Sequence, residues 1–366
     1  MPARHGASWQ SFKKHMRHPI VEEDLAAILG TGLPWGALDD KTVLVTGANG
    51  FLPAYMVETL LFRNEGLGRT ATQVIALVRS EERARRRFAA YAGREDLRFL
   101  VQDVALPMTL DMPVDMIIHA ASQASPKYYG SDPVGTLSAN VFGTANLLKL
   151  AAEKKCERFL FFSSGEVYGQ VRDDQVPTRE DDYGRVDPTQ VRACYAESKR
   201  MGENLCVSWH HQYAVPSVIV RPFHTYGPGM ALDDGRVYAD FVADIIAGRD
   251  IVMKSDGAAR RAFCYLADAT AGFFTVLLRG EAGQAYNVGN PSAETSILAL
   301  AQTLTGLFPD KNLQVVPAPT AAKAPGYLRS EIVRNSPSVA KVRQLGWEPM
   351  TTVEAGFRRT VRSFSE

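Results

Sequence analysis

Short apolar runs in this chain alternate with stretches in which apolar residues recur at helical spacing. The runs are rich in β-branched and aromatic residues and predict strands at 42–47, 73–79, 97–104 and 114–121, and at the starts of 158–169 and 216–228. The helical stretches between them are 54–63, 134–155 and 194–213. Because the strands are apolar along nearly their whole length, we expect a parallel sheet covered on both faces.

After residue 228 this regularity ends, and only 238–250 and 297–308 look helical. The pattern predicts an α/β fold, a Rossmann-type doubly wound parallel sheet with a smaller C-terminal substrate-binding lobe. We expect three parts: an N-terminal extension at 1–40 with one short helix, a dinucleotide-binding domain at 41–228 with a returning segment near 261–290, and a mainly substrate-binding lobe at 229–366.

Charge and composition exclude several classes of partner. The net charge is +1, from 41 basic and 40 acidic residues, so neither a nucleic acid nor a membrane surface is an expected partner. No stretch approaches the roughly 20 apolar residues that span a bilayer, and the basic N-terminus lacks the apolar core of a secretory signal. Four scattered cysteines indicate reduced thiols. We therefore expect a cytoplasmic protein, and no residue spacing indicates a metal site.

The first predicted strand runs into the turn Gly47-Ala48-Asn49-Gly50-Phe51-Leu52-Pro53. Glycines permit a tight turn and a close approach of the backbone to a pyrophosphate, which then lies at the N-terminus of the following helix. Pro53 replaces the third glycine of the usual pattern, and proline fits the first turn of a helix. We predict that Gly47, Asn49, Gly50, Phe51 and Leu52 bind a dinucleotide.

The ends of the next two strands bear on the choice of cofactor. Many NAD enzymes place an acidic residue after the second strand to bind the ribose hydroxyls, whereas this strand ends in Val78-Arg79-Ser80. Arg79 either holds the 2′-phosphate of NADP or stacks on the adenine, so the residues leave NAD and NADP both open. Asp103, followed by Val104, is placed to accept a hydrogen bond from the adenine amino group.

Tyr195 and Lys199 are four residues apart on a predicted helix, so both side chains face one pocket. A tyrosine pKa is normally about 10, and a nearby ammonium favours the ionised form, which can take a proton from a hydroxyl while hydride leaves the same carbon. Ser164, at a preceding strand end, would hydrogen-bond the reacting oxygen. Glu166 would handle a proton at the adjacent carbon or order water there.

With Gly47-x-x-Gly50, Asp103, His119-Ala120-Ala121, Ser164 and Tyr195/Lys199 in this order, the chain resembles the extended short-chain dehydrogenases over roughly residues 41–360. Within that family it is most similar to the UDP-glucuronate decarboxylases, through the segments 119–144, 192–200, 227–241, 260–269 and 345–349. The resemblance implies that Ala120 and Ala121 also contact the cofactor, that NAD is the first choice and NADP the alternative, and that two subunits form a homodimer through 134–155 and 194–213.

The same resemblance implies roles for individual side chains. The active-site residues would be Ser164, Glu166, Tyr195, Lys199 and Arg334, with Arg334 contacting a sugar carboxylate or acting as an acid. The residues implied to bind the nucleotide-sugar substrate are Ser125, Tyr128 or Tyr129, His224, Arg236, Val237, Arg261 and Arg334. Among these, Arg261 would bind the pyrophosphate, and the segment 234–237 would flank the nucleotide base.

Three positions depart from the decarboxylase pattern. Gly165 stands where serine is usual, His224 where asparagine is usual, and Val78-Arg79 where the acidic cofactor residue is usual. Gly165 bears on decarboxylation itself, and it also weakens a 4,6-dehydratase assignment, because an aspartate acid usually stands there.

The expected function is oxidation of a nucleotide sugar at C4, followed by loss of carbon dioxide from C5, as in UDP-glucuronate decarboxylase. A nucleotide-sugar or uronate 4-epimerase and a 4,6-dehydratase stay open on the same scaffold. A non-catalytic, cofactor-sensing protein is a more remote alternative, against which the complete set of Ser164, Tyr195 and Lys199 argues.

Overall fold

A computed structural model describes residues 17–66, 72–317 and 332–364. Its centre is a seven-stranded sheet in which every neighbouring pair of strands is parallel. In spatial order the strands are β11 (Ala285–Val288), β6 (Ser217–Pro222), β5 (Arg158–Phe162), β4 (Met116–His119), β1 (Lys41–Thr46), β2 (Thr72–Val78) and β3 (Leu97–Val101).

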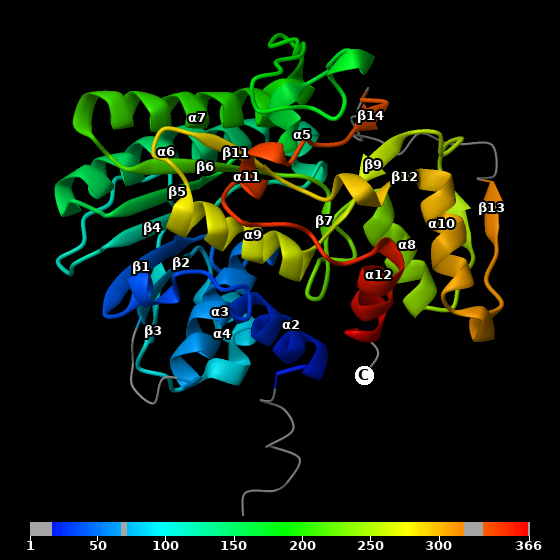
Figure 1. Cartoon of the computed structure of the whole chain (residues 1–366), viewed down its shortest axis with the longest axis horizontal. Coiled ribbons are helices and arrows are strands. Elements are labelled where there is room, and N and C mark those ends of the chain that lie inside the picture. The colour runs from blue at the N-terminus through cyan, green and yellow to red at the C-terminus, as the bar shows by residue number, and fades with distance from the viewer. Residues whose placement is uncertain (1–16, 67–71, 318–331, 365–366) are drawn as a thin grey trace, which may run out of the picture.

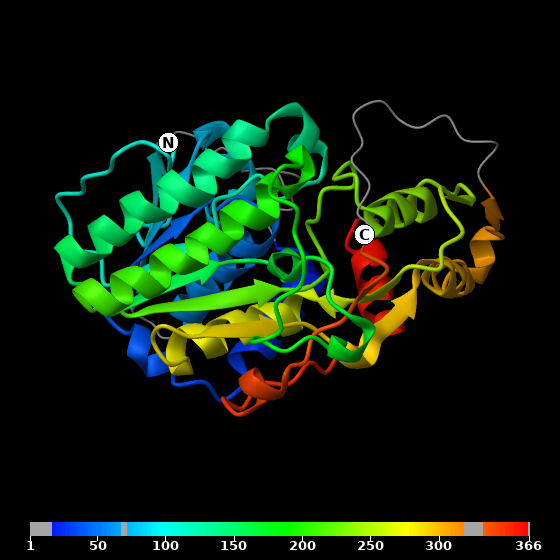
Figure 2. The same ribbon diagram turned by 90° about the horizontal axis from the view of Figure 1, so that it is seen from above.

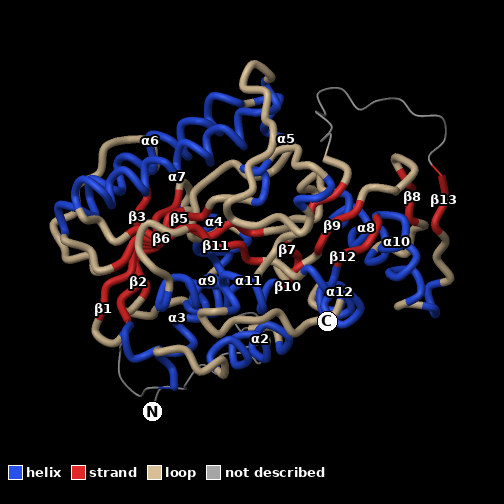
Figure 3. Tube along the Cα trace, turned by 45° about the horizontal axis from the view of Figure 1, so that its top comes forward, coloured by secondary structure: helices blue, strands red, loops and turns tan. Residues whose placement is uncertain are grey.

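Helices cover both faces of this sheet, as Figure 3 shows. Alternate strand residues point to opposite faces, so Leu44 packs with the helices on one face, whereas Val43 and Val45 pack with those on the other. The first face carries α6 (Pro133–Lys154) and α7 (Cys194–Tyr213). The second carries α3 (Phe51–Gly66) and α9 (Leu266–Arg279), and α2 (Pro19–Leu29) packs against these two helices.

The remaining elements surround the ends of the sheet strands or form a second group beside them (Figure 1). The shorter helices are α4 (Glu81–Arg87), α5 (Lys127–Ser131), α8 (Val237–Ile246), α10 (Ile297–Gly306), α11 (Ala340–Arg343) and α12 (Val353–Arg362). The small sheets are β7 (Thr225–Tyr226) with β10 (Cys264–Tyr265), β8 (Ile251–Met253) with β13 (Val315–Pro317), and β9 (Arg260–Ala262) with β12 (Glu294–Ser296) and β14 (Arg334–Asn335).

The strand order places a topological switch point beside β1. The chain proceeds from β1 through β2 to β3 on one side, and then crosses to β4 on the other side of β1. In open parallel sheets of this kind, ligands bind in the crevice beyond the carboxyl ends of the strands at the switch point. The turn after β1 and the chain segments after β4 and β5 therefore position the candidate site.

The predicted fold class is confirmed: a parallel, Rossmann-like sheet with helices on both faces and smaller sheets formed mainly by the C-terminal part of the chain. The third strand is shorter than the predicted 97–104. It ends at Val101, because the Asp103 carboxylate accepts a hydrogen bond from the Ala105 amide and forms a turn instead. The predicted returning segment contains α9 and β11, which pack on or join the large sheet. The three-part division of the chain stays a prediction.

Helix α2, in the predicted N-terminal extension, is tied to the body of the protein by a buried carboxylate. Asp24 is 3% exposed, and its Oδ2 accepts hydrogen bonds from the hydroxyls of Tyr265 at 2.7 Å and Tyr55 at 3.1 Å. Its Oδ1 lies 2.8 Å from the Arg359 guanidinium of α12. Burial raises the pKa of Asp24, against the opposing effects of these hydrogen bonds and of Arg359.

Helices α6 and α7 lie side by side (Figure 2), and each leaves apolar side chains in solvent. On α6 these include Val134 and Phe142, which are 69% and 59% exposed, and on α7 they include Met201 and Val207. The homodimer expected through these helices stays a prediction. Among the described residues, no helix is both long and apolar enough to cross a membrane.

Replacement of Arg359 by methionine should lower the free energy of unfolding by about 2 kcal/mol, because the buried Asp24 carboxylate loses its only guanidinium partner among the described residues. Urea denaturation followed by circular dichroism measures this. Arg358→Met, at the adjacent exposed position, is the matched control and should change stability by less than about 0.5 kcal/mol. Equal effects of the two substitutions would contradict the anchoring role of the pair.

Candidate active site

A cavity of about 230 Å³ opens at the carboxyl ends of β1, β4, β5 and β6. It lies where the switch point predicts a ligand. Its lining comes from the turn after β1, the segments after β4, β5 and β6, helix α7, the start of α8 and strand β14. The residues are Gly47, Gly50–Pro53, Ala120, Ser122, Ala124, Tyr129, Phe162–Glu166, Tyr195, Lys199, Pro222–Thr225, Arg236, Tyr238 and Asn335.

The turn after β1 has the shape that a dinucleotide pyrophosphate needs. Gly47 has a φ of +63°, and a Cβ there would lie 2.8 Å from the Ala121 Cα, so no other residue fits this approach of two chain segments. The Gly50 amide donates to the Gly47 carbonyl at 2.7 Å, and α3 begins at Phe51 with its N-terminus at the cavity. These residues fit NAD, with its pyrophosphate at the N-terminus of α3.

Tyr195 lies buried in the cavity wall, and Ser164 hydrogen-bonds to it. Burial, followed by the negative charge of Glu166, raises the pKa of Tyr195 to about 12; Ser164, Arg236 and Arg192 act in the opposite direction. In the absence of a bound cofactor, the phenol is therefore protonated near neutral pH. Ser164 also accepts a hydrogen bond from the Glu166 amide at 3.2 Å, which fixes its hydroxyl at the start of a 3₁₀ turn.

Lys199 lies one helical turn after Tyr195 on α7, 2% exposed, and its Nζ donates to the Phe162 carbonyl at 2.6 Å. Burial lowers the pKa of Lys199 to about 7, and the nearby Glu203 only partly opposes this. Its Nζ is 5.8 Å from the centre of the Tyr195 ring. The lysine therefore stands beside the tyrosine as predicted, but the buried site disfavours the charged form of both groups.

Glu166 has an arginine partner outside the cavity lining. The Arg192 guanidinium donates to both oxygens of the Glu166 carboxylate, at 3.0 and 3.3 Å. The same guanidinium lies 4.7 Å from the centre of the Tyr129 ring, and Tyr129 stacks on Tyr195 with ring centres 5.0 Å apart.

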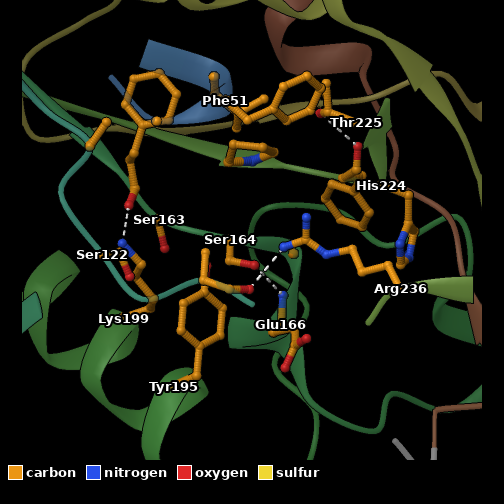
Figure 4. A pocket seen from close by; sticks show the side chains of 18 of the residues that line it. Phe51, Ser122, Ser163, Ser164, Glu166, Tyr195, Lys199, His224, Thr225 and Arg236 are labelled. Carbon is orange, nitrogen blue, oxygen red and sulfur yellow. Dashed lines mark hydrogen bonds between the residues drawn. The ribbon is translucent and has the colours of Figure 1, made fainter. Parts of the chain in front are cut away.

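Arg236 brings a second guanidinium to the cavity. It precedes α8, pairs with Asp234 at 2.8 Å and donates to the Ala124 carbonyl at 2.8 Å. Figure 4 shows its side chain extending toward Ser164 and Glu166.

His224 also lines the cavity, and its Nε2 atom is buried without a hydrogen-bond partner among the described residues. Burial, and then the charges of Arg261 and Arg236, hold the pKa of this histidine well below its usual value. The imidazole is therefore neutral.

Comparison with known proteins identifies the family. A model of the NAD dependent epimerase/dehydratase family matches residues 43–289. The UDP-glucuronic acid decarboxylase 6 of Arabidopsis thaliana is 34% identical over 317 residues, which are 86% of each chain. The chain belongs to the NAD-dependent epimerase/dehydratase family. It is thus an NAD-dependent enzyme of the extended short-chain dehydrogenase type.

Other members of the family are similar in sequence or in structure. UDP-glucuronic acid decarboxylase 1 of Danio rerio is 32% identical over 89% of this chain and 73% of its own length. The dTDP-glucose 4,6-dehydratase of Streptomyces venezuelae, solved with NAD, superposes with a TM-score of 0.73 at 25% identity, over 88% of this chain and 97% of that one. UDP-glucuronic acid 4-epimerase from Bacillus cereus, also solved with NAD, has a TM-score of 0.71 at 20% identity, over 88% and 99%, which shows the shared fold.

Eleven of the residues predicted for this family member's site line one cavity: Gly47, Gly50, Phe51, Leu52, Ala120, Ser164, Glu166, Tyr195, Lys199, His224 and Arg236. Two further predicted cofactor residues, Ala121 and Asn49, lie at or next to the turn after β1 but outside the cavity lining. The Ala121 amide donates to the Thr46 hydroxyl at 3.1 Å, directly behind Gly47, and Asn49 lies within the turn. Their roles in binding cofactor or substrate stay predictions.

The structure does not bring the other predicted residues into this cavity. Arg334 donates to both oxygens of Glu294 at 2.8 and 3.0 Å, and the next residue of the strand, Asn335, lines the cavity instead, because consecutive strand residues face opposite sides. Arg261 donates to the Ile332 carbonyl at 2.7 Å.

Five further predicted residues also lie off the cavity lining. Asp103 and Arg79 are exposed at strand ends, and Val104 is buried under α6. Ser125 donates to the Asp234 carbonyl at 2.5 Å, and Val237 begins α8.

Of the two tyrosines expected near the hexose, the structure places only the second in the cavity lining. Tyr128 is 38% exposed, whereas its neighbour Tyr129 is buried against Tyr195 and lines the cavity. The expectation that 234–237 flanks the nucleotide base stays a prediction, and Figure 4 shows Arg236 of this segment extending toward Ser164.

Sequence reasoning missed Ser122, Tyr238, Asn335 and Arg192. Ser122 lines the cavity with a buried hydroxyl that has no partner among the described residues. Arg192 lies three residues before Tyr195, which was the available signal, but only the fold brings it against Glu166. Among the described residues, no cluster of three or more histidine, cysteine or acidic side chains could hold a metal ion.

The low pKa of Lys199 predicts a pH dependence of stability in the cofactor-free protein. Between about pH 7 and its normal pKa of 10.5, Lys199 binds a proton in the unfolded chain but not in the folded one, so the free energy of unfolding rises with pH. We expect its contribution to rise by about 2 kcal/mol from about pH 7.5 to 9.5, and Lys199→Met to remove that rise. Urea denaturation at several pH values measures this. Identical slopes for the two proteins would contradict burial of an uncharged lysine.

Proposed function

We propose that this enzyme oxidises C4 of a nucleotide-activated uronic acid and then decarboxylates it, with UDP-glucuronate as the best-matched substrate. The observation that carries the substrate class is Arg236. Its guanidinium lies on the cavity wall and extends toward Ser164, and its charge acts on Tyr195. The guanidinium is already paired with Asp234 at 2.8 Å, and a C5 carboxylate would add a second charged partner on the cavity side, which a neutral hexose does not offer.

The nucleotide, including its purine or pyrimidine base, would lie at the end of the cavity away from Tyr195. A smaller adjoining pocket is bounded by Phe51, Met230, Ala231, Asp234 and Tyr238. It shares Phe51, Thr225, Arg236 and Tyr238 with the main cavity, so the two spaces adjoin.

NAD, held at the turn from Gly47 to Leu52, would supply the acceptor for the C4 hydride and the source of the hydride that reduces C4 again. Tyr195 takes the proton of the 4-hydroxyl, and Ser164 donates a hydrogen bond to the same oxygen. The resulting 4-ketone is β to the C5 carboxylate, so the electrons of the C5–C6 bond pass into an enolate as carbon dioxide leaves. C5 then takes a proton that comes from solvent water, on the side of the cavity where Glu166 lies, and Tyr195 returns its proton to the C4 oxygen as C4 is reduced.

Two features of the site shape this assignment. A Cβ at position 165 would lie 2.9 Å from the Phe223 ring, so the serine of decarboxylases and the aspartate of 4,6-dehydratases are both excluded unless Phe223 moves. Dehydration lacks its acid, whereas decarboxylation of a β-keto acid requires none at C6. The carboxylate role expected of Arg334 passes to Arg236, because Arg236 lines the cavity whereas Arg334 does not.

Epimerisation at C4 of the same uronate is the second candidate, and Arg236 is also the observation that favours it. A guanidinium that holds the carboxylate stabilises its negative charge, and that charge must leave the carboxylate as carbon dioxide departs. Firm binding by Arg236 would therefore slow decarboxylation relative to hydride return on the other face.

The purified enzyme supplied with NAD and UDP-glucuronate should release carbon dioxide and give a UDP-pentose, detected by mass spectrometry and by NMR of the sugar. Tyr195→Phe should reduce turnover by about 10²-fold or more. A product of unchanged mass with new sugar couplings would establish the epimerase instead. Loss of one water, or wild-type turnover by Tyr195→Phe, would contradict the proposal.

Arg236→Met should raise KM for UDP-glucuronate by about 10-fold or more, because the carboxylate loses its charged partner. Affinity for NAD, measured by calorimetry, should stay close to that of the wild type and shows that the variant is folded. Arg249→Met, which removes an exposed arginine paired with Asp244 just after α8, is the matched control. An unchanged KM in Arg236→Met would remove the basis for a uronate substrate.

A further inference from the structure

Glu166 reaches the cavity with its carboxylate already held from the other side. Both carboxylate oxygens accept hydrogen bonds from the two terminal nitrogens of Arg192, at 3.0 and 3.3 Å. The two side chains are only 22% and 28% exposed. A two-point contact between a planar guanidinium and a carboxylate fixes orientation as well as distance, so Glu166 has little freedom to turn within the site.

Arg192 is also the outer member of a stack that ends at the catalytic phenol. Its guanidinium lies 4.7 Å from the centre of the Tyr129 ring, and the Tyr129 ring lies 5.0 Å from that of Tyr195 with an angle of 17° between the planes. Tyr129 is 1% exposed and donates from its hydroxyl to the Ala124 carbonyl at 2.9 Å. The tyrosine ring in the middle is therefore clamped between a cation and Tyr195.

The position of Arg192 in the chain makes both contacts possible at once. It lies in the 3₁₀ turn Val191–Ala193, which leads directly into α7 and so into Tyr195. Glu166 comes from the 3₁₀ turn Gly165–Tyr168 after β5. One guanidinium thus connects the two chain segments that carry Ser164 and Tyr195.

We propose that Arg192 is a positioning residue of this active site, which holds the Glu166 carboxylate in place and, through Tyr129, the ring of Tyr195. The inference rests on the proposed function for the roles of Glu166 and Tyr195 in the reaction. Arg192 does not line the cavity and acts through Glu166 and Tyr129, which do.

The charges give this role a measurable consequence. The negative charge of Glu166 raises the pKa of Tyr195, and the positive charge of Arg192 opposes that effect. Removal of Arg192 alone leaves the Glu166 carboxylate uncompensated beside the phenol, so the pKa of Tyr195 must rise. Removal of both charges should cancel most of the rise in the pKa of Tyr195, because Glu166 affects this pKa more strongly than Arg192 does.

Carbon-13 NMR of enzyme labelled at the tyrosine Cζ, in the NAD-loaded protein, follows the ionisation of Tyr195 directly; Tyr195→Phe assigns the signal. Arg192→Met should move the midpoint upward by roughly one pH unit. Arg192→Met combined with Glu166→Gln should return it to the wild-type value or below. Arg192→Lys keeps the charge but not the two-point contact, so its midpoint should stay near that of the wild type while kcat falls.

Arg172→Met is the control, because Arg172 pairs with the exposed Asp174 away from the cavity lining and should shift nothing. A midpoint that stays in place in Arg192→Met, with the signal intact, would overturn the proposal and leave Arg192 a structural residue. If the spectrum shows that Arg192→Met is not folded, the test uses Arg192→Lys and Glu166→Gln instead. An unchanged kcat in the lysine variant, together with an unmoved midpoint in Glu166→Gln, would then overturn it.

The titration needs no substrate, so its result is separate from that of the proposed function. If the wild type leaves UDP-glucuronate unchanged while Arg192→Met still shifts the midpoint, the uronate assignment fails and the positioning role stands. If the wild type decarboxylates UDP-glucuronate and the midpoint does not move, the reverse holds.

Discussion

The close approach between the turn after β1 and the segment after β4 is the constraint on which the site depends. At Gly47 the two segments are so near that a Cβ would lie 2.8 Å from the Ala121 Cα. Directly behind it, Thr46 and His119 are joined by a hydrogen bond of 2.8 Å, and the other nitrogen of His119 lies 3.1 Å from the Thr144 hydroxyl of α6. The pKa of His119 is lowered to about 3 by burial and then by the charge of Lys199, so this link stays neutral. The cofactor turn is therefore fixed to the sheet and to α6 before any ligand binds.

Burial then determines the chemistry of the groups around the cavity. A site with little water disfavours every charge that lacks a partner. It raises the pKa of Tyr195 to about 12 and lowers that of Lys199 to about 7. Guanidinium groups stay charged in such a place, and each of the two at this site has a carboxylate partner: Arg192 has Glu166 and Arg236 has Asp234. The site thus keeps its permanent charges on arginines while its tyrosine and lysine can exchange protons.

Gly165 and His224, two of the positions that depart from the decarboxylase pattern, can be understood from the residues around them. Gly165 is matched to the Phe223 ring, which occupies the space that a side chain at 165 would need. His224 presents a neutral imidazole to the cavity, with a buried nitrogen that has no hydrogen-bond partner among the described residues. Gly165 follows Ser164 in the chain and His224 follows Phe223, so these two positions alter one wall of the cavity and leave Ser164, Tyr195 and Lys199 in its lining.

Local patterns suffice to predict the parallel sheet, the glycine turn after β1 and the grouping of Ser164, Tyr195 and Lys199, because these depend on periodicity, on glycine at fixed spacing and on one helical turn. The family also follows from such patterns, since the motifs that carry the resemblance are short and ordered along the chain. Which of two adjacent residues faces the cavity follows from the folded arrangement alone: Tyr129 rather than Tyr128, and Asn335 rather than Arg334. Neighbouring side chains in a strand or at a helix end point in different directions, and a shift of one residue reverses the choice. The fold likewise sets the pairing of Arg192 with Glu166, because it joins the two ends of the long connection between β5 and α7, and no local pattern relates residues so far apart in the chain.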